Sequence, residues 1–270
     1  MKRRSRRNLL IVAAAAMGAF LVCDAAAQER CKLTAIGTAN VDVVRDGRTL
    51  LLADGRELRL AVIEVADGSR AALQALVAGH PLRLERLGLE RLGLEGLGPE
   101  RLGPEHDRYG RLVAFAFIGD DQQSVQQAML EQRHARVSAR VGDKECADAL
   151  LSAERAARVA RRGLWADPNF APLSAENLTR LQAERGRFAL VEGKVLSVRE
   201  SGATIYVKFG RRWTRDFTVI ILRRMSRAFT AAGIEPKKLE GRRIRVRGWL
   251  EQRGGPIITA EAPEQIELAD

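Results

Sequence analysis

The chain has 270 residues, of which 46% are hydrophobic and 29% are charged. This composition excludes a chain that is disordered throughout and allows either one large domain or two small ones. The formal net charge of +11 is unevenly spread: residues 1–27 hold five Lys/Arg and one acidic residue, residues 28–186 hold 23 of each sign, and residues 187–270 hold 17 Lys/Arg against 10 Asp/Glu. Outside the first 27 residues, the basic excess is therefore C-terminal.

The first 27 residues have the pattern of a signal peptide. Five basic residues precede an apolar run over 9–22, and three alanines follow at 25–27. The run is shorter than the about 20 residues that a membrane-spanning helix needs, so we expect cleavage after Ala27. The pair Arg6-Arg7 also fits a twin-arginine export signal, and the general secretory route stays open beside it. We expect an exported protein, periplasmic or secreted, without a stable membrane span.

Two cysteines follow this leader, Cys31 and Cys146. An even number of cysteines in an exported chain favours a disulfide between them, because thiols can oxidise outside the cytoplasm. The alternative is two separately buried thiols.

The residues after the leader predict strands followed by a helix. Apolar residues alternate along three short segments, with a turn at Asp54-Gly55 before the third. Leu73, Leu76 and Val77 then recur at helical spacing. The predicted strands are 35–44, 49–52, 57–63 and 81–85, and the predicted helix is 69–78.

Residues 84–106 are of low complexity. The unit Leu-Glu-Arg-Leu-Gly recurs with variations every five residues, a period far below the ~20–50 residues of solenoid repeats. A glycine in each unit would weaken a helix by about 1 kcal/mol. We interpret the segment as an insertion in a loop; a Leu-rich arm that binds another protein is the alternative.

The rest of the chain predicts helices and then a change to strands. A strand at 111–118 comes first, followed by helices at 124–132 and 144–162, the second of which ends at Gly163. Beyond a linker at 168–172 and a connecting helix at 175–185, we expect a helix near 226–232 and five strands, at 189–198, 204–209, 217–221, 244–250 and 257–260. Five short strands and one helix suit a small barrel of the oligonucleotide-binding (OB) type.

Four short motifs occur in a fixed order: Asp46-Gly47-Arg48-Thr49-Leu50, the segment from Arg59 to Asp67, Asp107-Arg108-Tyr109-Gly110-Arg111, and Gly163-Leu164-Trp165. Over residues 33–166 the sequence thereby resembles the staphylococcal nuclease (thermonuclease) family. The resemblance implies a five-stranded OB-type barrel with three helices, in which calcium and two arginines cleave phosphodiester bonds of DNA or RNA. The expected fold class is α+β, with this barrel followed by a second small, mainly β, OB-like domain.

The resemblance also assigns candidate catalytic residues. Phosphodiester cleavage needs arginines that hold the phosphate oxygens, a cation and a carboxylate that orients water. Arg59 and Arg111 match the two catalytic arginines of the family. Asp67 stands where the family has a general-base Glu, and Glu64 where it has an Asp that binds calcium. Both carboxylates thus differ in length by one methylene, and a shift of about 1 Å at a reacting centre can cost on the order of a hundredfold in rate.

Arg48 alters the expected metal site. The family has Asp-Gly-Asp-Thr where this chain has Asp46-Gly47-Arg48-Thr49, so a calcium ligand has become a cation. Two unit charges 4 Å apart interact by about 4 kcal/mol at an effective dielectric constant of 20, and a divalent ion feels about twice that. Calcium, with Glu64 and Asp46 as its ligands, should bind weakly or not at all. Arg48 either points to solvent or places its guanidinium where the metal would lie, paired with Glu64 and Asp67.

The C-terminal third has basic residues interleaved with aromatic ones. Counterion release and base stacking make such surfaces suited to single-stranded nucleic acid. On a strand, 243, 245 and 247 share one face; the alternative is a solvated face on a basic protein, with the tryptophans in the core. The candidate nucleic-acid-binding residues are Arg211, Arg212, Trp213, Arg243, Arg245 and Arg247.

The expected organisation is a signal peptide (1–27), a thermonuclease-like domain (28–166), a linker with a connecting helix (167–186) and a basic OB-like domain (187–270). The expected function is binding of DNA or RNA, with single strands favoured, or action on it as an endonuclease whose hydrolysis is weakened or lost. No small-molecule cofactor is expected besides the calcium that the resemblance implies. The alternative is a structural or interaction module of the cell envelope, with no role in nucleic-acid binding.

Overall fold

The computed structural model describes residues 31, 33–66, 68–87, 106–160, 163–167, 170–212 and 214–269, which belong to one structural unit. The predicted signal peptide and residues 88–105 of the predicted repeat insertion lie outside the described residues. Among the described helices, none is long and apolar enough to cross a bilayer.

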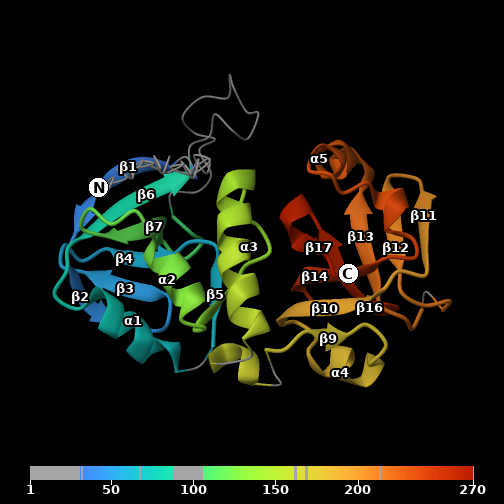
Figure 1. Ribbon diagram of the computed structural model, residues 1–270, viewed down its shortest axis with the longest axis horizontal. Coiled ribbons are helices and arrows are strands. Elements are labelled where there is room, and N and C mark those ends of the chain that lie inside the picture. The colour runs from blue at the N-terminus through green and yellow to red at the C-terminus, as the bar shows by residue number, and fades with distance from the viewer. Residues whose placement is uncertain are drawn as a thin grey trace, which may run out of the picture. The chain divides into compact units, whose positions relative to one another are not determined.

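A six-stranded sheet organises the first half, in the order β1-β6-β7-β4-β3-β2 (Figure 1). Neighbouring strands are antiparallel except β4 and β7, which are parallel. Only Asn40 separates β1 from β2 in the chain, yet they lie at opposite ends of this order, so the continuous stretch 33–44 pairs first with β6 and then with β3. The strands are β1 (Leu33–Ala39), β2 (Val41–Val44), β3 (Thr49–Leu52), β4 (Glu57–Leu60), β6 (Leu82–Leu87) and β7 (Leu112–Ile118).

The predicted strand 57–63 is wrong in its second half, because the chain turns after Leu60. Val62 adopts a positive φ of 57°, a conformation that β-branched residues rarely take. The chain then forms a separate short strand, β5 (Ile63–Val65), which pairs antiparallel with β8 (Ala135–Val137). The turn thus moves Glu64 out of the main sheet.

Three helices cover the first core: α1 (Ser69–Val77), α2 (Val125–Glu131) and α3 (Lys144–Val159). Side-chain caps fix two of their starts: Ser124 Oγ accepts a hydrogen bond from Gln127 N, and Asp143 Oδ1 accepts one from Cys146 N. A 3₁₀ turn, η3 (Gly163–Ala166), follows α3. The helices predicted in this half are confirmed, with shifted ends.

The second half repeats part of the strand-pairing pattern of the first, but its strands form two sheets, in the orders β17-β14-β10-β9 and β11-β12-β13-β16-β15. The stretch from β10 to β11 pairs first with β14 and then with β12, and β13 runs parallel to β16, with α5 between them in the chain. The elements are β9 (Leu173–Ser174), α4 (Leu178–Ala183), β10 (Phe188–Lys194), β11 (Ser197–Ser201), β12 (Thr204–Lys208), β13 (Thr218–Leu222), η4 (Arg223–Met225), α5 (Ser226–Ala231), η5 (Pro236–Leu239), β14 (Arg243–Trp249), β15 (Glu251–Arg253), β16 (Gly255–Ala260), η6 (Pro263–Gln265) and β17 (Ile266–Leu268).

Each half has its own hydrophobic core, and a third cluster joins them. The first core draws on residues from Val44 to Ala153, and the second on residues from Leu173 to Ile266. In the third cluster, Leu190 of β10 packs with Ala157, Leu164 and Trp165 from the end of α3 and from η3. Apolar contacts therefore continue from one half into the other.

The predicted disulfide is confirmed. Cys31 and Cys146 are bonded, with their Cα atoms 4.4 Å apart and 115 positions apart in the sequence. The bond ties the start of the described chain to the first turn of α3, and the alternative of two separate thiols is thereby wrong.

Replacing both cysteines by serine should lower the free energy of unfolding by up to about 4–5 kcal/mol, because a cross-link that closes a loop of more than 100 residues restricts the unfolded chain. Urea unfolding of the two proteins measures the difference. Mass spectrometry of the purified protein, alkylated without reduction, should find neither Cys31 nor Cys146 modified; two alkylated thiols would contradict the bond.

Candidate functional site

Strand pairing brings three candidate residues to one place. Arg59 of β4 is in register with Thr49 of β3 and with Val113 of β7. Arg48 directly precedes β3, and Arg111 directly precedes β7, two positions before Val113. The sheet therefore brings Arg48 and Arg111 close enough to Arg59 to influence its pKa, although Arg48 and Arg111 are 63 positions apart in the sequence.

Glu64 receives two of these arginines. Arg48 Nη1 donates to Glu64 Oε2 and, at 3.4 Å, to the carbonyl oxygen of Ile63. Arg59 Nη2 lies 3.8 Å from the other carboxylate oxygen, Oε1. The Glu64 side chain is only 14% exposed, so both of its oxygens face guanidinium groups in a partly desolvated setting. Of the two placements predicted for Arg48, the structure shows the one that is paired with Glu64; Asp67 lies outside the described residues.

The three arginines influence one another. Burial lowers the pKa of Arg59, and the positive charges of Arg48 and Arg111 lower it further, against the opposing effects of Glu64 and Asp107. The Nε of Arg59 is buried and has no hydrogen-bond partner. Three guanidinium groups with two carboxylates leave a net positive site, which suits an anion.

Asp107 positions Arg111. Arg111 Nε donates to Asp107 Oδ2 at 2.8 Å, and Asp107 Oδ1 accepts hydrogen bonds from the backbone N–H groups of Tyr109 and Arg111. Burial would raise the pKa of Asp107, but these hydrogen bonds outweigh it and lower the pKa. Gly110, with φ of 77°, closes the turn. Sequence reasoning assigned no role to Asp107, although its place four residues before Arg111 was a usable signal.

Tyr109 presents an aromatic ring beside this site. Its side chain is among the exposed large ones, at 66%. The guanidinium carbons of Arg108 and Arg111 lie 4.7 and 5.2 Å from the centre of its ring. An exposed ring flanked by cations is a suitable surface for a nucleobase.

The donor set does not fit calcium. Both oxygens of Glu64 face cations, and Asp46 Oδ1 accepts the backbone N–H of Arg48 at 2.8 Å, a turn-forming hydrogen bond. In the described part of the chain, the one group of three metal-ligating side chains is Cys31, Asp143 and Cys146, whose sulfurs are bonded to each other. A divalent cation at Glu64 would have to displace the guanidinium of Arg48.

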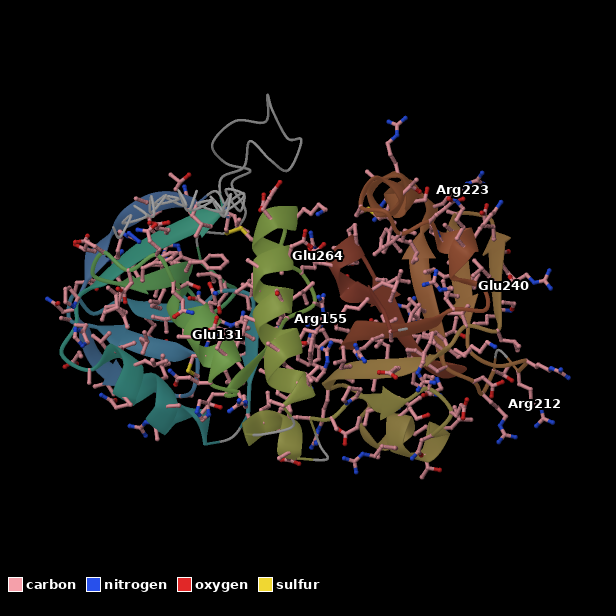
Figure 2. The ribbon with its side chains drawn as sticks, viewed as in Figure 1. Glu131, Arg155, Arg212, Arg223, Glu240 and Glu264 are labelled. Atoms are coloured by element: carbon pink, nitrogen blue, oxygen red, sulfur yellow. A yellow bond between two sulfur atoms is a disulfide. The ribbon has the colours of Figure 1, made fainter. Side chains whose placement is uncertain are left out.

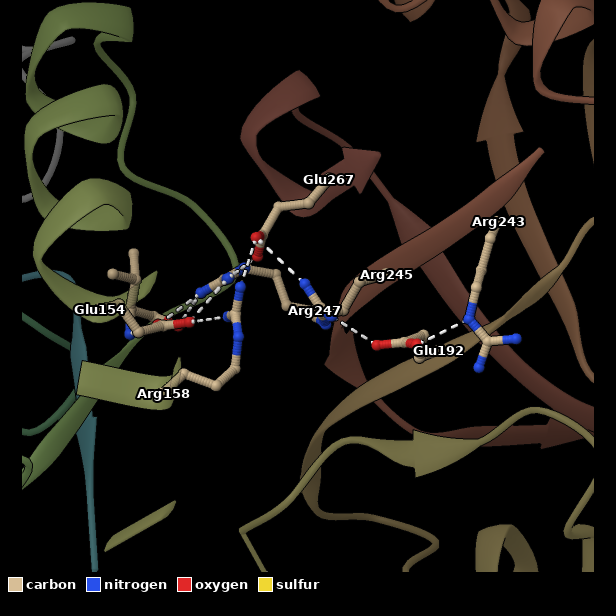
Figure 3. Close-up of polar contacts among 8 residues, drawn as sticks. Glu154, Arg158, Glu192, Arg243, Arg245, Arg247 and Glu267 are labelled. Carbon is tan, nitrogen blue, oxygen red and sulfur yellow. Dashed lines mark hydrogen bonds and ion pairs between the residues drawn. The ribbon is translucent and has the colours of Figure 1, made fainter. Parts of the chain in front are cut away.

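The expected nucleic-acid contact by Arg247 is wrong, because this side chain is buried. Arg247 is 1% exposed. Its Nη1 and Nη2 donate to the two carboxylate oxygens of Glu154 at 2.9 and 3.0 Å, and it also pairs with Glu267 (Figure 3). Arg158 donates to Glu154 and Glu267 at 2.8 and 2.9 Å. We call these four residues, Arg247, Glu154, Glu267 and Arg158, the buried ion cluster.

The other two arginines of the predicted row are also paired with carboxylates. Arg243 Nε donates to Glu192 at 2.8 Å, and Arg245 pairs with Glu192 and with Glu267 (Figure 3). Arg245 is largely covered, whereas the side chain of Arg243 is 57% exposed. The continuous basic row that strand alternation predicted is therefore mostly neutralised inside the protein.

Arg211 and Arg212 remain exposed. Figure 2 shows Arg212 at the edge of the C-terminal strands, away from α3. Its backbone N–H donates to Asp216 at 2.7 Å, and this hydrogen bond fixes the turn after β12. Trp213 lies outside the described residues.

Comparison with known families supports the resemblance in one segment. Residues 96–167 match the family of staphylococcal nuclease homologues. The match includes Asp107 and Arg111, together with α2, α3 and η3, while Arg48, Arg59 and Glu64 precede it. No curated protein matches the chain. The matched segment indicates a nuclease-like function related to nucleic acid.

Arg247→Ala should lower the free energy of unfolding by about 3–5 kcal/mol, because it leaves Glu154 and Glu267 buried with fewer positive partners. The matched control, Arg243→Ala on the same strand, removes a side chain that is 57% exposed and leaves Glu192 paired with Arg245, so it should cost less than about 1 kcal/mol. Urea unfolding measures both variants. Equal losses would show that the buried ion cluster is no more stabilising than a surface pair.

The buried ion cluster should also make stability depend on acid. Burial would raise the pKa of Glu267, but Arg247 and Arg158 outweigh it and lower the pKa from 4.5 to about 2. A lowered pKa stabilises the folded state above pH 4.5, and this stabilisation of about 3 kcal/mol is lost as pH falls toward 2.

Glu267→Gln should therefore be less stable than wild type at pH 6, and the difference should shrink as the pH falls from 4.5 toward 2. Urea unfolding across this range, with the exposed Glu251→Gln as control, measures it. A difference that is constant with pH would contradict the lowered pKa.

Proposed function

We propose that this protein is an exported thermonuclease-like protein that binds DNA or RNA, and in which Arg48 replaces the calcium ion of the family. Hydrolysis of phosphodiester bonds is then weak or lost. The observation that carries the proposal is the pairing of the Arg48 guanidinium with Glu64, the residue that stands at a family metal-ligand position.

The strand pairing supports two OB-type barrels, one in each half, which we place at 28–166 and 187–270. In each half one continuous stretch pairs with two different strands, and a helix connects the third strand to the fourth. The parallel pairs β4–β7 and β13–β16 occupy corresponding places in the two halves. OB-type barrels commonly bind oligonucleotides.

Without a metal, the site can hold a phosphate but activates water poorly. Arg59 and Arg111 can each donate two hydrogen bonds to phosphate oxygens. The fixed charge of Arg48 adds to the attraction of the site for an anion. A guanidinium has no open coordination position, so it cannot lower the pKa of a bound water as a metal ion does. Asp67 is the proposed carboxylate that orients water, and its short side chain weakens that role further.

Arg48→Asp should bring back dependence on calcium. Wild type should cleave single-stranded DNA slowly and at the same rate with calcium or with a chelator. Arg48→Asp returns a carboxylate beside Glu64, so its rate with calcium should rise roughly ten- to a hundredfold. Adding Glu64→Asp and Asp67→Glu should raise the rate further and non-additively, since all three residues act on one ion and one water.

The matched control is Arg45→Asp, which changes the same charge at an exposed position that pairs with Glu57 at 3.8 Å. This control should stay insensitive to calcium. Strong calcium-dependent cleavage by wild type, abolished by Arg59→Ala, would refute the proposal and show a working calcium site. A wild type that binds an envelope protein in a salt-insensitive way, and no nucleic acid, would favour the envelope module.

A further inference from the structure

A hollow on the second half is lined by cations. It lies over β11, β12 and the turn that follows β12, and its lining residues are Leu196, Ser197, Arg199, Lys208, Gly210 and Arg211. Among the residues that line it, three carry a positive charge and none carries a negative one.

The strand register shows that these side chains share the outer face of the sheet. Ser197 is paired with Lys208, and Arg199 with Tyr206. Directly paired residues of antiparallel strands point to the same face, and the alternate positions Ile205 and Val207 are buried in the second core. Arg199, Tyr206 and Lys208 therefore point away from that core.

The three cations of the hollow differ from Arg243, Arg245 and Arg247 of β14, which all pair with carboxylates. Arg199, Lys208 and Arg211 have no side-chain hydrogen bond or ion pair with any described residue. Glu200, the acidic residue nearest in sequence, pairs instead with Lys237 at 3.4 Å. Asp216, whose carboxylate lies against Gly210, accepts the backbone N–H of Arg212. No described carboxylate therefore pairs with the three cations, and a bound polyanion would relieve the repulsion between their like charges.

An aromatic ring lies in the same surface row. Tyr206 is flanked across the sheet by Arg199 on β11 and by Ile220 on β13, and all three positions are open to solvent at least in part. The ring offers a stacking surface for a base, while the cations beside it can contact phosphates.

We propose that this outer face of β11 and β12 binds single-stranded nucleic acid. Arg199, Lys208 and Arg211 contact successive phosphates, and a base stacks on Tyr206. The inference rests on the proposed function for its ligand class, and it assigns the C-terminal binding role to this face in place of the arginines on β14. A strand held here and at Arg59 would engage both halves of the protein.

The test measures binding of the full mature chain to a fluorescent oligodeoxythymidine of about 20 nucleotides, by anisotropy, with chelator present. Arg199→Gln/Lys208→Gln should weaken binding and reduce the slope of log K against log salt by about 1.4, since each phosphate contact contributes about 0.7 on a single strand. Tyr206→Leu should weaken binding roughly 5- to 150-fold without changing that slope, because it removes stacking and no charge.

The matched control is Lys238→Gln/Arg253→Gln, which removes two exposed charges that pair with Glu235 and Glu251. This control should keep the wild-type affinity and slope to within about twofold. Thermal unfolding of every variant verifies that the protein is folded. Equal losses in the control and in Arg199→Gln/Lys208→Gln would overturn the inference, because they would show a response to net charge alone.

Three further outcomes distinguish this inference from the proposed function. If Arg59→Ala abolishes oligonucleotide binding while Arg199→Gln/Lys208→Gln leaves it unchanged, the proposed function stands and the second surface is refuted. If wild type does not bind the oligonucleotide but binds vesicles of anionic phospholipid through Arg199 and Lys208, the inference is refuted as well. Calcium-dependent cleavage by wild type would refute the altered metal site. Arg199→Gln/Lys208→Gln would still be expected to weaken binding, because the second surface does not depend on the metal.

Discussion

The buried pairing of Arg247 with Glu154 is the constraint on which the rest of the structure depends. Glu154 Oε2 also accepts the backbone N–H of Val137 at 2.6 Å, and Arg247 Nη1 donates to the carbonyl oxygen of the same residue at 3.0 Å. The pair thus supplies hydrogen-bond partners for the backbone N–H and C=O of Val137 at one edge of β8. The other edge of β8 pairs with β5, the strand that carries Glu64. Charges that are removed from water must be fully paired. Separating the two halves would therefore break the ion pairs of Arg247 with Glu154 and of Arg158 with Glu267, and β8 would lose the hydrogen bond that Val137 accepts from Arg247.

A second contact reinforces this coupling. Arg136 of β8 is in register with Glu64 and donates to the carbonyl oxygen of Phe188 on β10 at 2.7 Å. Its guanidinium lies against the rings of Phe170 and Phe188. Burial lowers the pKa of Arg136 to about 10, against the opposing charges of Glu154 and Glu64, so it remains charged at neutral pH. The C-terminal half therefore supports the strand pair that carries Glu64.

Basic residues of this protein occupy two different settings, which differ in whether a carboxylate pairs with the side chain. One group, Arg158, Arg245 and Arg247, pairs with carboxylates inside the protein. The other group lines a surface hollow and has no acidic partner among the described residues: Arg199, Lys208 and Arg211. In the first half, Arg48 belongs to neither group, because it is paired with a carboxylate and also borders a site of net positive charge. Net charge alone says that a polyanion is a plausible ligand, but only the pairing pattern shows which cations are available to one.

The sequence by itself determined the helices of the first half and most of its strands, the cysteine pair and the grouping of Arg48, Arg59 and Glu64, because local periodicity and ordered motifs carry that information. It did not predict β8, the short strand that pairs with β5. It misplaced the turn at Val62, where the main chain leaves the sheet. Alternation along β14 established that Arg243, Arg245 and Arg247 share a face, but tertiary structure alone decided that Arg245 and Arg247 on this face are covered. The partner that covers it, Glu154, lies 93 residues earlier on α3, and no local pattern on a strand reports which distant carboxylate will pack against it.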